Sequence, residues 1–317
     1  MSPDPVTVLS RSTVVDESVV LDESTVLDES TWRAREEAHT ARVEPWVAPR
    51  RRRRVRGESH PVDDFLFDYY PYSVARLTTW HPGFGIEVTG SIGRFLQHPA
   101  YRSTPDGATV DAHQAVGRSS RLDLVIRLLQ STSEREPEFG CFGMHEWAMV
   151  YGLSQDQIRH AGQPLRLSPE EIVGVVDSVG LRCTHIDAYR FFTPEAVHRN
   201  AHRPTRATQP EFEQPGCVHA AMDLYKYAFW FSPLVPSDLV ADCFANAARA
   251  RELDMRASPY DMSPFGLEPI RVETPEGRRD YAAAQRVLMA DTDPLREQLL
   301  SVLSALAAAL DATTAQA

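Results

Sequence analysis

The stretch from Cys217 to Phe231 reads CVHAAMDLYKYAFWF. It contains neither glycine nor proline, and all but three of its residues are apolar or aromatic, so it predicts a helix that is buried nearly all round. The three exceptions, His219, Asp223 and Lys226, are spaced by four and three residues and therefore share one helix face. The sequence thus predicts a core helix that carries three titratable side chains in a single stripe.

Lys226 is the only lysine among the 33 basic side chains, and all the others are arginine. An amine can act as a nucleophile or proton acceptor when its pKa is lowered, whereas a guanidinium cannot. Lys226 is therefore either a poised amine or the partner of Asp223 in an ion pair, which on an exposed helix would contribute only about 0.2–0.5 kcal/mol. Both interpretations stay open.

Apolar periodicity, prolines and capping residues predict further helices on both sides of this one. The clearest helix start is Ser168-Pro169-Glu170-Glu171, a capping residue followed by proline and two acids. Pro71 is expected to divide residues 62–80 into two short helices. The other predicted helices cover residues 32–43, 118–130, 142–151, 168–178, 238–255, 277–290 and 295–312.

Two segments are expected to be extended. Residues 86–96 predict a small hairpin, and residues 181–192 predict an extended strand. The fold class is therefore mainly α, a single multi-helix domain with a small extended or hairpin element.

The chain divides into three parts. Residues 1–30 repeat an acidic Asp-Glu-Ser motif at six-residue intervals and predict a disordered tail, because such a repeat cannot build a core. Residues 31–57 predict a helix followed by an arginine-rich linker, and residues 58–317 form the helical body. Residues 1–57 carry ten acidic and ten basic side chains, so the net charge of −11 belongs to the body.

Several features predict a cytoplasmic protein without a membrane partner. The longest C-terminal apolar run, residues 299–310, is shorter than the roughly 20 residues that a bilayer span requires. The first residues lack the basic-then-apolar pattern of a secretory signal. The four cysteines, at positions 141, 183, 217 and 243, are far apart in sequence, which is typical of reduced thiols rather than of disulfides or a zinc ribbon.

Polar side chains also occur in other apolar segments. His145 and Glu146 lie in an apolar helix, and strand alternation would place His185 and Asp187 on one side of the extended segment. Each of these four side chains is either part of a functional site or a group with only a structural or solvated role. Because buried polar groups need partners, we expect five side chains to meet in one pocket: His145, Glu146, His185, His219 and Asp223.

The same residues raise the question of a metal ion. Together with Asp187 they are chemically sufficient for zinc or iron, but no spacing matches His-Glu-x-x-His. The sequence therefore assigns no metal ligand and no cofactor. Phosphate-binding loops, dinucleotide-binding glycine patterns and nucleophile elbows are also absent from the sequence, which disfavours NTPases, Rossmann dehydrogenases and α/β-hydrolases.

Five longer motifs resemble a family of actinobacterial proteins commonly named 3-methyladenine DNA glycosylase. The resemblance covers about residues 33–296. The motifs are HPVDDFL at 60–66, WHPGFG at 80–85, GMHEW at 143–147, QPGCVH at 214–219 and MDLYK at 222–226.

The resemblance implies a DNA-base N-glycosylase that removes alkylated adenine. Such an enzyme needs aromatic residues to stack the flipped base, a carboxylate near the sugar and basic contacts to phosphate. Asp223 would activate water or stabilise the oxocarbenium ion, with Lys226 as the alternative nucleophile. The remaining catalytic candidates are His219, Glu146 and His145, and the substrate-binding candidates are Tyr69, Tyr70, Trp147, His185, Asp187, Tyr225 and Arg256. Contacts to DNA would come from Arg50, Arg51, Arg52, Arg53, Arg54 and Arg56.

Two other functions remain open. One is a small-molecule enzyme, metal-dependent or not, with a buried His/Glu/Asp pocket. The other is a non-catalytic binding protein whose buried polar groups only organise helices. A basic cleft beside Asp223 would favour DNA, whereas a closed polar pocket would favour a small ligand.

Overall fold

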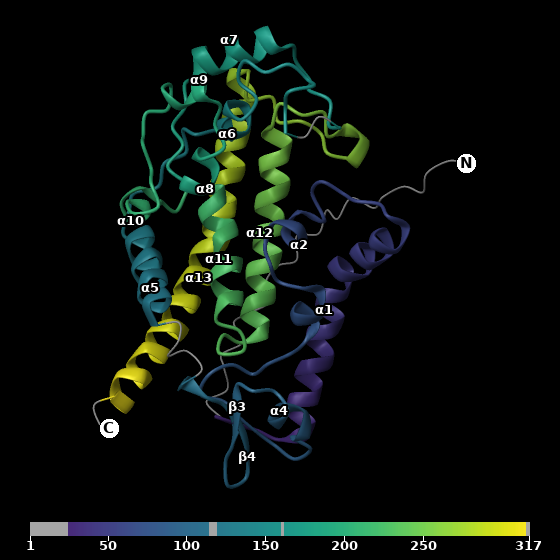
Figure 1. Cartoon of the computed structure of the whole chain (residues 1–317), viewed down its shortest axis with the longest axis vertical. Coiled ribbons are helices and arrows are strands. Elements are labelled where there is room, and N and C mark those ends of the chain that lie inside the picture. Colours follow the sequence, from purple (N-terminus) through teal and green to yellow (C-terminus); the bar gives the residue numbers. More distant parts are fainter. Residues whose placement is uncertain (1–24, 114–118, 160–161, 315–317) are drawn as a thin grey trace.

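Figure 1 shows the computed structural model of the chain, which describes residues 25–113, 119–159 and 162–314. The fold is mainly α-helical, as the sequence predicts. Long helices run along the longest axis of the molecule, with a small sheet at one end and a group of short helices and loops at the other. No helix in these ranges combines the length and apolar character needed to cross a membrane.

Helix α11 (Val218–Trp230) lies at the centre of the bundle. It packs mainly against α12 (Ser237–Ala257) and also against α13 (Pro275–Thr314). Ten of its side chains are buried, among them Asp223. The expectation of a core helix with polar groups inside is therefore confirmed.

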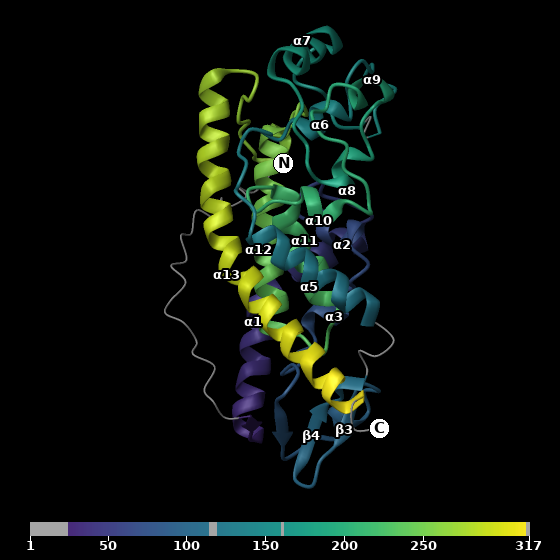
Figure 2. The ribbon, with the colours of Figure 1, turned by 90° about the vertical axis from the view of Figure 1, so that its left-hand side faces the viewer.

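Helix α13 is a single helix of 40 residues, where the sequence predicts two helices separated near Pro294. A proline inside a helix removes one hydrogen bond and costs about 3 kcal/mol. The helix continues because it packs along its length against α5 (Ser119–Ser133), α11 and α12, as Figure 2 shows. These contacts keep the helix continuous, although Figure 2 shows that it bends near its middle.

Helix α1 (Glu29–Arg56) overturns the expected helix over 32–43 followed by a linker. It runs through Pro45 and Pro49 to the end of the arginine block. Its buried residues, Trp32, His39, Val43 and Val47, recur at helical spacing and join the hydrophobic core. The arginine block therefore belongs to the folded body.

Asp64 holds the C-terminal half of α1 in place. Its carboxylate is buried and accepts Arg53 Nε at 3.0 Å and the His60 backbone N–H at 3.0 Å, and Arg50 Nη1 lies 3.1 Å away. Arg50 and Arg53, which the sequence analysis assigns to DNA contacts, thus form ion pairs with a buried carboxylate.

The expected disordered tail is wrong for its last residues. Val26–Leu27 form β1, and the Asp28 side chain caps α1. Residues 1–24 lie outside the described ranges.

The sheet also differs from the expected hairpin over 86–96. Strand β2 (Glu87–Thr89) pairs in parallel with β1 and antiparallel with β4 (Gly107–Val110), which in turn pairs with β3 (Tyr101–Ser103). The order is β1-β2-β4-β3. After β2 the chain turns into the short helix α4 (Gly93–Leu96), so it cannot fold back on β2 directly.

The remaining helices are short. Pro71 divides its segment as predicted, into α2 (Phe65–Tyr69) and α3 (Val74–Thr78). Ser168 forms the predicted capping box at the start of α7 (Pro169–Val179). The others are α6 (Met144–Ala148), α8 (Ile186–Tyr189), α9 (Pro194–Val197), α10 (Gln209–Phe212) and the 3-10 helix at Ser263–Phe265.

The strand expected over residues 181–192 does not form. Leu181 makes one isolated bridge with Asn200, and α8 begins at Ile186. A strand needs a neighbouring strand to pair its backbone groups, and this segment has none beyond that bridge within the described ranges. His185 and Asp187 therefore lie around a helix start rather than on one side of a strand.

The first prediction concerns the role of Asp64. Asp64→Asn should lower the free energy of unfolding by about 3–5 kcal/mol, because it leaves two partly buried guanidinium groups without their carboxylate. Urea unfolding at neutral pH measures this loss. Arg52→Gln, an exposed change on the same helix, should stay within about 0.5 kcal/mol of the wild type. Equal losses in the two variants would contradict this role.

Candidate functional site

Three histidines from separate elements meet at one end of α11. His219 lies in its first turn, His145 in α6, and His185 immediately before α8. The ring centroids of His145 and His219 are 4.5 Å apart, and those of His219 and His185 are 5.3 Å apart. We refer to these residues as the histidine stack.

The turn before α6 explains how His145 reaches this place. Gly143 has a φ of 68°, which favours glycine, and a Cβ at this position would lie 3.1 Å from Ala257 Cβ. The glycine lets α6 approach the end of α12 closely. His145 consequently faces α12 as well as α11.

One end of the histidine stack contacts a group that we call the Asp254 cluster: Asp254, Glu146, Arg251 and His145. Arg251 Nη1 donates to Glu146 Oε1 at 3.2 Å and to Asp254 Oδ2 at 3.3 Å. The guanidinium carbon lies 3.9 Å from the ring centroid of Phe65. These contacts fix the Asp254 carboxylate through one of its two oxygens.

The other oxygen of Asp254 lacks such a partner. Asp254 Oδ1 and His145 Nε2 are 2.8 Å apart, but neither makes a hydrogen bond with any described residue, because the two are not aligned as donor and acceptor. Both side chains are at least 95% buried. The two groups are close enough for an ion pair, but a buried polar atom without an aligned hydrogen bond costs about 1–3 kcal/mol.

Burial and neighbouring charges set the protonation of this cluster. Burial raises the pKa of Asp254, but the charge of nearby His145 lowers it by a larger amount. The pKa of Asp254 therefore lies below its usual value. Burial, together with the charge of His145, holds the pKa of His219 well below its ordinary range. At neutral pH Asp254 is thus a carboxylate and His219 a neutral imidazole with a free lone pair.

The other end of the histidine stack contacts a second group, the Asp223 cluster, formed by Asp223, Lys226, Asp187, His185, Tyr70 and Tyr227. Asp223 accepts hydrogen bonds from Tyr70 Oη at 3.1 Å, from Tyr227 Oη at 3.3 Å and from Lys226 Nζ. His185 Nε2 lies 3.4 Å from Asp223 Oδ2, without hydrogen-bond alignment. Both Asp223 oxygens are therefore paired.

Lys226 is held between two carboxylates. Its Nζ donates to Asp223 Oδ2 and, at 3.4 Å, to Asp187 Oδ2. Burial lowers the pKa of Lys226, but the charges of Asp223 and Asp187 raise it more, so it lies above its usual value. The amine is protonated at neutral pH, which favours the ion-pair interpretation over the poised nucleophile.

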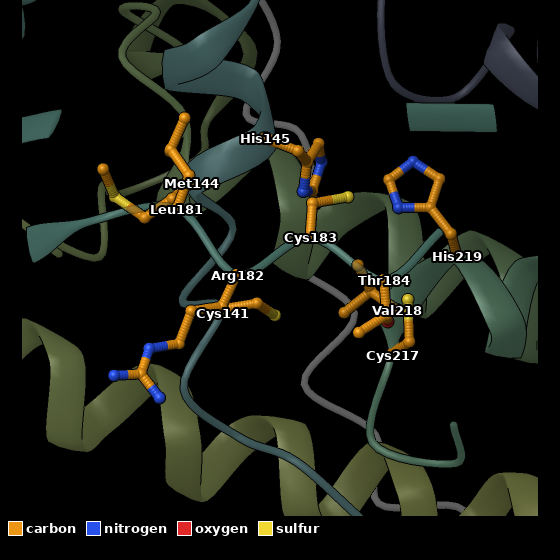
Figure 3. A pocket seen from close by; sticks show the side chains of 10 residues that line it. All are labelled: Cys141, Met144, His145, Leu181, Arg182, Cys183, Thr184, Cys217, Val218 and His219. Atoms are coloured by element: carbon orange, nitrogen blue, oxygen red, sulfur yellow. The ribbon is translucent and has the colours of Figure 1, made fainter. Parts of the chain in front are cut away.

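A cavity of about 10 Å³ adjoins the histidine stack at His145 and His219, as Figure 3 shows. It has room for roughly one water-sized sphere. Three thiols line it, and the Cys183 side chain points toward the two imidazoles. Burial raises the pKa of Cys183 to about 12, so this thiol is neutral. The lining residues are Cys141, Met144, His145, Leu181, Arg182, Cys183, Thr184, Cys217, Val218 and His219.

The structure brings together most of the residues that the sequence singles out. His145, Glu146, His185, His219 and Asp223 meet through the histidine stack and its two clusters. Asp187, Lys226 and Tyr70 join at Asp223. Their chemical roles stay predictions.

Four expected substrate-binding residues have other contacts. Trp147 is fully buried and donates its indole N–H to Ala257 O at 2.8 Å. Tyr225 packs among core aromatic rings. Tyr69 is 38% exposed and stacks on Phe65, and Arg256 donates to Glu268 O at 3.0 Å. None of these contacts involves a residue of the histidine stack.

Sequence reasoning missed Arg251, Asp254, Glu213 and the cavity thiols. Arg251 and Asp254 are an i, i+3 pair on a helix that the sequence does predict, and Asp254 stands between two apolar residues. That pattern of a carboxylate in an apolar turn was the available signal. The cysteines gave no such signal in the sequence, because positions 141, 183 and 217 come together only in the fold.

The arginine block is largely paired with acids. Besides Arg50 and Arg53, Arg51 lies 3.7 Å from Glu44 and Arg56 lies 3.9 Å from Glu58. The block forms the end of a helix rather than a free arm, and its contact with DNA stays a prediction.

Comparisons with protein-family models, with curated proteins and with solved structures find no match. The function is therefore argued from the geometry of the site.

The second prediction separates the two roles of Lys226. Lys226→Arg should fold and lose no more than about 1–3 kcal/mol, because a guanidinium keeps the charge but needs more space. Lys226→Met should lose about 3–5 kcal/mol, because it leaves buried carboxylates uncompensated. Urea unfolding of both variants measures the difference. Equal stability of the two would remove the ion pair as the reason for this lysine.

The third prediction uses pH. Burial raises the pKa of Asp223, but Lys226 and His185 lower it more, so the net pKa lies below 3.8, its ordinary value. The stabilisation from the ionised carboxylate is then fully present above pH 3.8 and is lost as the pH falls below it, since the unfolded chain takes up the proton first. The difference in unfolding free energy between wild type and Asp223→Asn should shrink over that acidic range. A difference that does not change with pH would contradict the assignment.

Proposed function

We propose that this protein is an enzyme that acts on a small molecule at the cavity beside His145 and His219. One observation carries the proposal. His145 lines the cavity and lies 2.8 Å from the buried Asp254, and the two facing atoms, His145 Nε2 and Asp254 Oδ1, have no hydrogen-bond partner among the described residues. Native proteins pair nearly all buried polar groups, and a bound water, ion or ligand is one explanation for unpaired atoms beside a cavity.

The size and closure of the site support a small substrate. Asp223 is buried within a closed polar cluster of partners rather than beside a basic cleft. The cavity holds about 10 Å³, which is far too small for a flipped purine. Only a small molecule, or a small reactive group of a larger one, fits beside the imidazoles.

Arg182 supports an anionic substrate. It lines the cavity while its side chain is exposed, and no ion pair with it occurs in the described ranges. Many arginines of this acidic chain have carboxylate partners, as Arg50, Arg53 and Arg251 do. Its guanidinium points away from His145 and His219 in Figure 3, and an exposed guanidinium there suits a carboxylate or phosphate group that lies outside the cavity.

The fourth prediction tests this function. The wild type, incubated with a mixture of small carboxylates and phosphate esters, should consume at least one compound, as followed by mass spectrometry. His219→Asn should abolish that turnover, while His113→Ala, a change at an exposed histidine three residues after the end of β4, should preserve it. Folding of each variant is checked by circular dichroism.

The same preparations test the glycosylase expectation. Methylated duplex DNA is incubated with the wild type and with Asp223→Asn, and free 3-methyladenine is measured. Base release by the wild type that is lost in Asp223→Asn, without consumption of any small molecule, would overturn the proposal in favour of the glycosylase.

A further inference from the structure

We propose that His145, His219 and Asp254 bind one divalent transition-metal ion, zinc or iron(II), through two imidazole nitrogens and one carboxylate oxygen. Each residue offers one ligand atom, and these atoms all lie within 4.8 Å of one another. The three come from α6, α11 and α12, so the end of the helix bundle forms the site. The sequence alone assigns no ligand here.

The distances suit a single ion. Zinc binds imidazole nitrogen and carboxylate oxygen at about 2.0–2.2 Å, so two ligand atoms on one ion lie roughly 3–4 Å apart. His145 Nε2 and Asp254 Oδ1 are 2.8 Å apart without forming a hydrogen bond. This separation is slightly shorter than that of two ligand atoms on one ion, so both atoms reach a shared ion after a small outward shift of the two side chains.

The surroundings orient the carboxylate and leave it available. Arg251 Nη1 binds Asp254 Oδ2 at 3.3 Å, which leaves Oδ1 directed toward the histidines. Such neighbouring hydrogen bonds commonly fix metal ligands in position. Arg251 also binds Glu146, so one guanidinium faces two carboxylates. Once His145 has lost its proton, as a metal ligand must, the two carboxylates outweigh the single guanidinium, and the cluster then favours a cation.

The ligand set indicates the class of metal. Two imidazoles and one carboxylate suit zinc or iron(II), whereas magnesium and calcium prefer sites made only of oxygen ligands. Three protein ligands leave at least one position open, which is typical of catalytic rather than structural sites. The adjoining cavity, with room for about one water molecule, lies beside His145 and His219, where that position would be.

The three thiols line the cavity but do not belong to this ligand set. The proposed set is therefore distinguishable from a thiolate site. The catalytic meaning of the ion rests on the function proposed above, but metal binding can be measured without any substrate. A failure of metal binding and a failure of turnover are thus separate results.

The fifth prediction is one metal ion per chain. Full-length protein is stripped with a chelator and titrated with Zn²⁺, with Co²⁺, with Fe²⁺ under anaerobic conditions and with Mg²⁺. The wild type should bind one Zn²⁺, Co²⁺ or Fe²⁺ and no Mg²⁺, as measured by elemental analysis after desalting. Bound metal should also raise the unfolding temperature, because it binds only the folded state.

The variants identify the ligands. His219→Asn and Asp254→Asn should each weaken Zn²⁺ binding at least about 100-fold, since loss of a ligand should exceed the 10–100-fold effect of a neighbouring residue. His185→Asn and Cys183→Ser are matched controls, the first in the histidine stack and the second in the cavity wall, and both should still bind one ion. Circular dichroism and the metal-dependent rise in unfolding temperature separate lost binding from lost folding.

Three results would overturn the inference. The folded wild type could bind no ion, or His219→Asn and Asp254→Asn could bind as tightly as the wild type. The third is a cobalt complex with a thiolate charge-transfer band that disappears in Cys183→Ser, which would assign the ion to a thiolate site instead.

Discussion

The rest of the structure depends on the polar face of α11, on which Asp223 is buried and His219 and Lys226 are half-buried. Burying a charge without a partner costs several kcal/mol, and burying a polar group without one costs about 1–3 kcal/mol. Since α12 and α13 enclose α11, those partners must come from the elements packed around it. The short helices gathered at one end of the bundle supply them: α6 brings His145, and the start of α8 brings His185 and Asp187.

The two buried carboxylates, Asp223 and Asp254, differ in how many of their oxygens have hydrogen-bond partners. Asp223 has both oxygens paired, with tyrosine hydroxyls and a lysine, and its cluster behaves as a compensated ion pair. Asp254 has one oxygen bound by Arg251, while the other meets a histidine without bonding to it. The sequence favours the Asp223–Lys226 pair on α11 as the reactive one, whereas the function proposed here relies on the His145–Asp254 pair between α6 and α12.

The sequence could predict what depends on local pattern. The stripe on α11, the break at Pro71 and the capping box at Ser168 follow from spacing and residue type, and all three are present. It failed where tertiary contacts override local preference. Helix α13 continues through Pro294 because its neighbours hold it, and residues 181–192 do not form a strand because no other strand lies beside them.

The site also contains residues that the sequence pattern could identify and residues that only the tertiary structure identifies. Each of His145, His185 and His219 could be singled out as a polar residue in apolar surroundings, so their meeting was foreseeable. Asp254 was harder to find, because a carboxylate near the end of an arginine-rich helix reads as one more surface ion pair until the fold shows it fully buried. The distinction between a satisfied and an unsatisfied buried carboxylate exists only in three dimensions. At Asp254 it depends on a histidine nitrogen that comes close to the carboxylate without hydrogen-bond alignment, and what sets the candidate site apart is that this contact lies beside a second histidine and a cavity.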